Sequence, residues 1–137
     1  ARAMLLAIGL QESKFQHRRQ VGGSARGFWQ LEFGGGVQGV RVHHQTQPLL
    51  QSALRALRYD ASSPSEDLYR AIEHNDVLAC VMARLLLWTL PYDLPARNQP
   101  QDGWWQYMAA WRPGKPHAET WPDFYRQAWE MVEPTSE

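Results

Sequence analysis

Two segments of this chain are apolar around nearly the whole circumference of a helix, and they restrict the fold more than any other feature. The first is "AMLLAI", residues 3–8, and the second is "NDVLACVMARLLLWTL", residues 75–90. A surface helix keeps a polar face, whereas a helix that is apolar on all sides has to be covered on all sides. We therefore expect two buried helices with the remaining helices packed around them.

Helical periodicity and helix-start signals predict further helices, which cover residues 48–57, 63–72, 102–111 and 120–132. Pro48 suits the first turn of its helix. Ser63 with Glu66, and Thr120 with Asp123, have the spacing of a capping box. Together with the two apolar segments this gives about six helices.

A different pattern occupies residues 18–45, where helical periodicity fails. Two glycine groups, Gly22-Gly23 and Gly34-Gly35-Gly36, flank the aromatic segment "SARGFWQLEF". Glycine clusters around β-favouring aromatic residues are typical of short strands and turns. We therefore expect an α+β fold that is mainly α, with a small β region near residues 26–44, in a single domain spanning residues 1–137.

Charge and cysteine content exclude several kinds of partner. The formal net charge is +0 and the pI is about 7.2, so we expect no nucleic-acid binding and no attachment to an anionic membrane. The single cysteine, Cys80, excludes an internal disulfide and a multi-cysteine metal site. His43 and His44 lack a third ligand at suitable spacing, so we expect no metal and no other cofactor. No apolar run approaches the ~20 residues of a membrane span, and no signal-peptide pattern is visible.

Glu12 stands on the apolar stripe of the first helix, together with Leu5, Ile8 and Phe15. Burial disfavours the charged form of a carboxyl group and raises its pKa, so a buried Glu12 is suited to act as a general acid. The competing interpretation is a glutamate at the helix end that points to water beside Lys14.

Glu32 is a candidate for a second carboxyl group in the same site. Many glycosidases use one carboxyl group to protonate the departing oxygen and another as base or nucleophile. Glu32 follows the segment "GFWQL" and precedes a glycine run that can bend the chain over a cleft. Its competing interpretation is a solvated residue, or a partner of Arg26 or Arg41.

Two motifs in this order resemble the paired signature of the lysozyme-like superfamily, specifically soluble lytic transglycosylases and goose-type lysozymes. Glu12-Ser13 ends an apolar helix, and Gly27-Phe28-Trp29-Gln30 stands where the family carries Gly-Leu-Met-Gln. Downstream, "YMAAWRPGKP" is similar to the family's Ala-Ala-Tyr-Asn-Ala-Gly motif, with Ala109-Ala110 and Gly114 matching. The sequence departs from that motif at Trp111 and Arg112, which replace its Tyr and Asn.

The resemblance implies roles for individual residues. Glu12 becomes the catalytic acid or acid/base, and Glu32 takes the place of a second acidic residue found in goose-type lysozymes. The resemblance implies that the residues of the two motifs bind substrate, together with an aromatic and a hydroxyl side chain from the downstream helix. These residues are Ser13, Phe28, Trp29, Gln30, Tyr107 and Trp111. Tyr107 stands one helical turn before Trp111 and offers a hydroxyl on the same helix face. Most of the remaining tryptophans, which include Trp104, Trp105, Trp121 and Trp129, are expected in the core.

The expected function is cleavage of the β-1,4 bond between N-acetylmuramic acid and N-acetylglucosamine in peptidoglycan, by a lysozyme-like protein of bacteriophage or prophage type. One alternative is a lytic transglycosylase in which Glu12 works alone and the product ends in an anhydro ring. Another is a non-catalytic phage structural or glycan-binding module. The expected place of action is the bacterial cell wall, reached through the periplasm or from a virion or larger assembly.

Overall fold

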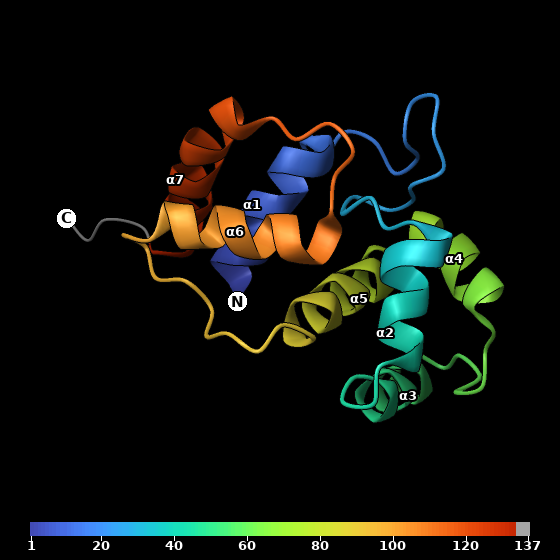
Figure 1. Ribbon diagram of the computed structural model, residues 1–137. Helices are drawn as coiled ribbons and strands as arrows, with labels where there is room; N and C mark the ends of the chain where they lie inside the picture. Colours follow the sequence, from blue (N-terminus) through green and yellow to red (C-terminus); the bar gives the residue numbers. More distant parts are fainter. Residues whose placement is uncertain (134–137) are drawn as a thin grey trace.

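A computed structural model describes residues 1–133 of the chain (Figure 1). Seven α-helices lie within these residues, joined by one π-helical and one 3₁₀ turn. They are α1 (Arg2–Ser13), η1 (Phe33–Val37, π), α2 (Gln38–Val42), α3 (Gln47–Ala56), α4 (Ser65–His74), α5 (Asp76–Trp88), α6 (Pro100–Trp111), η2 (Ala118–Thr120, 3₁₀) and α7 (Trp121–Val132). The expectation of a mainly helical chain is confirmed.

The helices form two groups on either side of α5. Helices α1, α6 and α7 lie together, while α2, α3 and α4 gather on the other side (Figure 1). The packing of α1 against α7 joins the first and last helices of the described chain. None of the helices within residues 1–133 combines the length and apolarity needed to cross a membrane.

The two apolar segments form helices that supply much of the core. From α1 these core residues are Ala3, Met4, Leu5, Ala7 and Ile8, and from α5 they are Leu78, Ala79, Met82, Ala83, Leu85, Leu86 and Leu87. One stripe of α5 stays open, because Val77 is exposed and an apolar hollow of about 620 Å³ lies beside it. The expectation of two buried helices is therefore correct for α1 and for most of the circumference of α5.

The expected β region near residues 26–44 is wrong for most of its length. Among the described residues its only β pairing consists of isolated bridges, from Arg26 to Arg19 and from Arg26 to Leu31. The glycine run instead belongs to η1, and the chain continues directly into α2. Val37 and Val40 stand three residues apart and are both fully buried, so burying one helix face outweighs the strand preference of the aromatic residues before it.

Neither capping box forms. Helix α4 begins at Ser65, and the hydroxyl of Ser63 donates instead to the carbonyl of Asp60 at 2.6 Å. The hydroxyl of Thr120 donates to the side-chain oxygen of Gln11 at 2.9 Å, a residue of α1. The capping-box pattern predicts that each hydroxyl accepts a hydrogen bond from a backbone N–H of its own helix. Each hydroxyl instead bonds to a group outside that helix.

Candidate active site

A groove of about 670 Å³ lies between the C-terminal end of α1, the loop that follows it, and the segment after α6. The C-terminal ends of α1 and α6 both point toward this loop in Figure 1. The residues that line the groove are Gln11, Glu12, Gln20, Ala25, Gln30, Glu32, Tyr107, Trp111, Arg112, Pro113, Gly114, Lys115 and His117. The groove therefore contains both candidate carboxyl groups, brought from two separate parts of the sequence.

Helix α1 ends immediately after Glu12, and the way it ends fixes the position of that residue. Lys14 and Phe15 have positive φ angles of 53° and 55°, which turn the chain out of the helix. The ring of Phe15 then folds back over Gly9, where a Cβ would lie 2.0 Å from the ring carbon Cζ. A side chain at residue 9 would displace Phe15, so Gly9 allows the compact reversal that leaves Glu12 at the groove.

Glu12 is partly buried, and its Oε1 accepts a hydrogen bond of 2.8 Å from the hydroxyl of Tyr107. Burial raises the pKa of Glu12, the hydrogen bond from Tyr107 lowers it and the charge of Glu32 raises it, and the resulting pKa is about 7. Glu12 is therefore half protonated near neutral pH. The alternative of a solvated glutamate at the helix end does not agree with this environment.

Tyr107 is the buried partner of Glu12, with 2 % of its surface exposed. Its pKa lies above the ordinary value of 10, because its hydroxyl is desolvated and faces Glu12. The hydroxyl therefore remains a donor throughout the pH range in which Glu12 titrates. Its position four residues before Trp111 places both side chains on the groove side of α6, as the sequence spacing predicts.

Glu32 lies on the opposite, loop-derived side of the groove and is exposed. It has no salt bridge within residues 1–133, and the two arginines considered as partners have other contacts. Arg26 lies over the ring of Tyr69, and Arg41 donates to the carbonyl of Ser63. The carboxyl group of Glu32 is thus available to a molecule in the groove.

Gln30 also lines the groove, in a left-handed conformation with φ of 52°. Its side-chain Nε2 donates to the carbonyl of Gly27 at 2.8 Å, which closes a short turn. Gly27 itself has φ of 75°, and a Cβ there would lie 3.1 Å from the carbonyl oxygen of Ile72. The turn therefore depends on glycine at its first position and presents the side chain of Gln30 to the groove.

Three residues expected to bind substrate have structural roles instead. Ser13 is 6 % exposed, and its hydroxyl donates to the carbonyl of Phe28 at 2.6 Å. Trp29 is 7 % exposed and donates from Nε1 to the carbonyl of Leu5 at 2.8 Å. Phe28 is partly buried, between the ring of Phe15 and the guanidinium of Arg18. These residues attach the loop to α1, and none of them lines the groove.

Trp111 has both roles. Its ring lines the groove, and its Nε1 donates to the carbonyl of Trp29 at 2.7 Å, which ties the end of α6 to the loop. The indole N–H of Trp111 thus acts as a positioning contact between α6 and the loop. Its aromatic face remains part of the groove surface.

A basic rim on the groove, formed by Arg112, Lys115 and His117, was not expected from the sequence. Within residues 1–133 neither Arg112 nor Lys115 has a carboxylate within salt-bridge distance, whereas His117 lies 3.4 Å from Glu119. Gln11 anchors the rim, since its Nε2 donates to the carbonyl of His117 at 2.9 Å. The only sequence signal was the basic spacing of "RPGKPH" directly after a helix that carries site residues.

Residues 1–133 contain no group of three or more His, Cys, Asp or Glu side chains arranged to hold a metal ion. His43 and His44 stack on each other on the surface, away from the groove.

Comparison with known proteins gives no family to which the chain belongs: no family model, no curated protein and no solved structure matches it.

Proposed function

We propose that this chain is a lysozyme-like glycosidase that cleaves the β-1,4 bond between N-acetylmuramic acid and N-acetylglucosamine in peptidoglycan. One observation carries the proposal: Glu12 has a pKa of about 7 at the edge of an open groove, where Tyr107 donates to it. A carboxyl group tuned to neutral pH is what protonation of a glycosidic oxygen requires. The likeness of Glu12-Ser13 and Gly27–Gln30 to the lysozyme-like signature supports the same reading.

In the proposed first step the protonated Glu12 gives its proton to the bridging glycosidic oxygen. The bond between that oxygen and the anomeric carbon breaks, the shorter glycan leaves with a new hydroxyl group, and positive charge develops on the sugar ring. Glu12 is left as a carboxylate, which the hydroxyl of Tyr107 stabilises by its hydrogen bond. Gln30 and the face of Trp111 supply polar and aromatic contacts to the sugar rings.

The second step decides between hydrolysis and transglycosylation. In hydrolysis Glu32 takes a proton from water, and the resulting hydroxide adds to the anomeric carbon. In transglycosylation the 6-hydroxyl of the muramic acid adds to the same carbon and gives its proton to Glu12, so that an anhydro ring forms. The exposed carboxyl group of Glu32 favours hydrolysis, because it lies in the groove and has no salt bridge within residues 1–133.

The decisive experiment measures clearing of a bacterial cell-wall suspension by the wild-type chain and by Glu12→Gln. We expect wild type to clear the suspension and Glu12→Gln to be slower by about 10²–10⁴-fold, the usual contribution of a general acid. The control is Glu66→Gln, which removes an exposed carboxyl group from α4 that is paired with Arg70. Equal clearing by wild type and Glu12→Gln would contradict the mechanism.

The same assay separates the remaining alternatives. If neither form clears the wall but both sediment with it, the chain is a glycan-binding module and not an enzyme. If wild type is active, mass spectrometry of the products distinguishes a reducing end from an anhydro end, which is lighter by one water. The place of action, at the cell wall from the periplasm or from a phage particle, is part of this proposal.

A further inference from the structure

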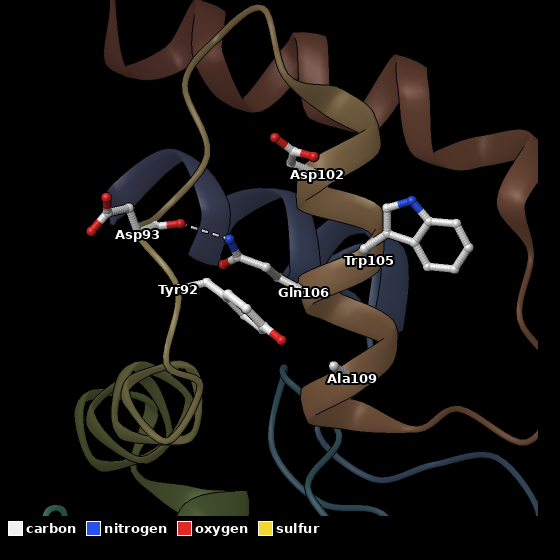
Figure 2. Close-up of a pocket in the computed structure, with 6 residues that line it drawn as sticks. All are labelled: Tyr92, Asp93, Asp102, Trp105, Gln106 and Ala109. Atoms are coloured by element: carbon white, nitrogen blue, oxygen red, sulfur yellow. Dashed lines mark hydrogen bonds between the residues drawn. The ribbon is translucent and has the colours of Figure 1, made fainter.

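A second pocket, of about 420 Å³, lies against α6 (Figure 2). It is lined by Tyr92 and Asp93 from the connection between α5 and α6, and by Asp102, Trp105, Gln106 and Ala109 from α6. Its size falls within the range of about 300–1,000 Å³ that is usual for small-ligand sites. None of these residues lines the groove around Glu12.

The periodicity of α6 separates the two sites. Residues 102, 105, 106 and 109 recur at three- and four-residue spacing and share one stripe, whereas Tyr107 and Trp111 stand on the opposite side of the helix. A residue changed on the outer stripe therefore has no direct contact with Glu12. We call this pocket the outer pocket.

Two aromatic side chains at the outer pocket are exposed and do not belong to the hydrophobic core. Trp105 is 61 % exposed and Tyr92 is 67 % exposed. In Figure 2 the ring of Tyr92 extends toward α6 from the connecting segment, whereas the indole of Trp105 projects from α6 in the direction away from Tyr92. A ligand that covers either ring removes apolar surface from water, so both rings can stabilise a bound molecule.

Polar groups complete the lining. Gln106 donates from Nε2 to the backbone carbonyl of Asp93 at 2.7 Å, which fixes its side chain and leaves the amide oxygen as an acceptor. Asp102 adds a carboxylate, while the carboxylate of Asp93 points away from α6 (Figure 2). Ala109 is exposed and short, so it adds little bulk to the lining.

We propose that the outer pocket binds a neutral pyranose ring of a glycan chain and anchors the protein to it, apart from the groove that carries Glu12. A pyranose ring presents an apolar C–H face that stacks on aromatic side chains, and hydroxyl groups that donate to carboxylate and amide oxygens. No Lys, Arg or His lines the pocket, so it is not built for an anionic ligand. The glycan chemistry rests on the proposed function, and the pocket itself does not.

Binding is tested with chitotetraose, a soluble neutral oligomer of N-acetylglucosamine, added to the ¹⁵N-labelled chain. The indole N–H signal of Trp105 is identified from its loss in Trp105→Phe. We expect this signal to shift on titration, and to shift less in Tyr92→Ala and in Ala109→Gln, which adds a bulky side chain to the lining with a residue that favours helix. A Trp105 signal that stays unshifted up to the solubility limit of chitotetraose would overturn the proposal.

Anchoring is tested by sedimentation with insoluble peptidoglycan. Trp105→Ala is expected to weaken binding about threefold to tenfold, the usual effect of losing one aromatic contact, while turnover of a soluble peptidoglycan fragment stays at the wild-type rate. The control is Met131→Ala, which removes an exposed apolar side chain from α7 that lines neither site. Undiminished sedimentation of Trp105→Ala would contradict the anchoring role.

Two further outcomes separate this inference from the proposed function. If wild type cleaves nothing but the Trp105 signal responds to chitotetraose, the outer pocket stands and the catalytic proposal fails. If the Trp105 signal responds to an amine such as N-acetyl-lysine amide and not to the sugar, the pocket recognises a cation beside Asp102, and the glycan proposal is wrong.

Discussion

The two walls of the groove around Glu12 are built in opposite ways. The helical wall consists of the C-terminal ends of α1 and α6, and it presents Glu12 hydrogen-bonded to the buried Tyr107. The loop wall consists of the irregular segment between α1 and η1, and it presents the exposed Glu32. Both walls carry a glutamate, and burial in the helical wall raises the pKa of Glu12 to about 7.

The difference shows how one residue type acquires two chemical roles. A helix packed into the core carries its side chains into a region of low polarity, where the charged form of a carboxyl group is disfavoured. A loop runs over the surface because its backbone needs water, and at Glu32 this loop leaves the side chain exposed. Helix and loop thus supply an acid that holds its proton and a carboxylate open to solvent.

The partly buried position of Glu12 in the helical wall should make the protein less stable as pH rises. The pKa of Glu12 is raised from 4.5 to about 7. Below pH 4.5 the group is protonated in both the folded and unfolded states and costs nothing. As pH rises toward 7 only the unfolded state releases the proton, so above pH 7 folding carries a penalty of about 3 kcal/mol.

Glu12→Gln removes this penalty, because an amide does not ionise. We expect its free energy of unfolding, relative to that of wild type, to be about 3 kcal/mol larger at pH 8 than at pH 4. Urea denaturation at the two pH values measures this difference. The matched variant Glu66→Gln should change little between them, and an equally small change for Glu12→Gln would show that Glu12 is not desolvated.

The loop wall is tested by Glu32→Gln. If Glu32 activates water, the initial rate of cell-wall clearing should fall about 10²-fold, with products that still end in a reducing sugar. Glu119→Gln, an exposed carboxyl group near the rim, should leave the rate unchanged. An active Glu32→Gln whose products carry an anhydro ring would assign catalysis to the helical wall alone.

The junction between the walls is tested by Ser13→Ala. Ser13 is buried, and its hydroxyl joins α1 to the carbonyl of Phe28 at 2.6 Å. Removing it leaves that carbonyl without its side-chain donor, and we expect a loss of about 2 kcal/mol in the free energy of unfolding. Ser52→Ala, on an exposed face of α3, should cost less than about 0.5 kcal/mol. If both variants are equally stable, the loop wall is held by the aromatic contacts and not by Ser13.

A smaller effect is expected from Tyr107→Phe, which removes the donor that stabilises the Glu12 carboxylate. The pKa of Glu12 should then rise above about 7, so the alkaline limb of the profile of kcat/KM against pH should move upward by about one pH unit. Tyr125→Phe removes another tyrosine hydroxyl, bonded to the carbonyl of Ala96, and should leave the limb in place. An unmoved limb in Tyr107→Phe would mean that Glu12 does not set it.

The sequence identified the helical wall more completely than the loop wall. Helical spacing is regular, so Glu12 on the stripe of α1, and Tyr107 one turn before Trp111, were both placed correctly by periodicity. The loop sequence has no regular spacing of apolar residues. The roles of Phe28 and Trp29, and of Ser13 at the end of α1, therefore depended on the direction in which each side chain points. Here the preference of Trp29 and Ser13 for buried hydrogen-bond partners decided the outcome.

The same limit explains the error at residues 26–44. Glycines and aromatic residues signal a departure from regular helix, but they do not specify what replaces it. The burial of Val37 and Val40 among the helices turned the glycine run into η1 and α2. The capping boxes failed for a related reason, since Ser63 and Thr120 found partners outside their own helices.

What the sequence determined by itself is six of the seven α-helices found within residues 1–133, all but α2, and the presence of a carboxyl group on an apolar stripe, because both follow from local spacing along the chain. Only the tertiary structure decided that Tyr107 meets Glu12, that Glu32 faces the same groove, and that Trp105 stays in water while Trp29 is buried. Those facts depend on contacts between residues far apart in the chain. The pKa of Glu12 belongs with them, since desolvation is produced by the neighbours that the fold assembles and not by the glutamate alone.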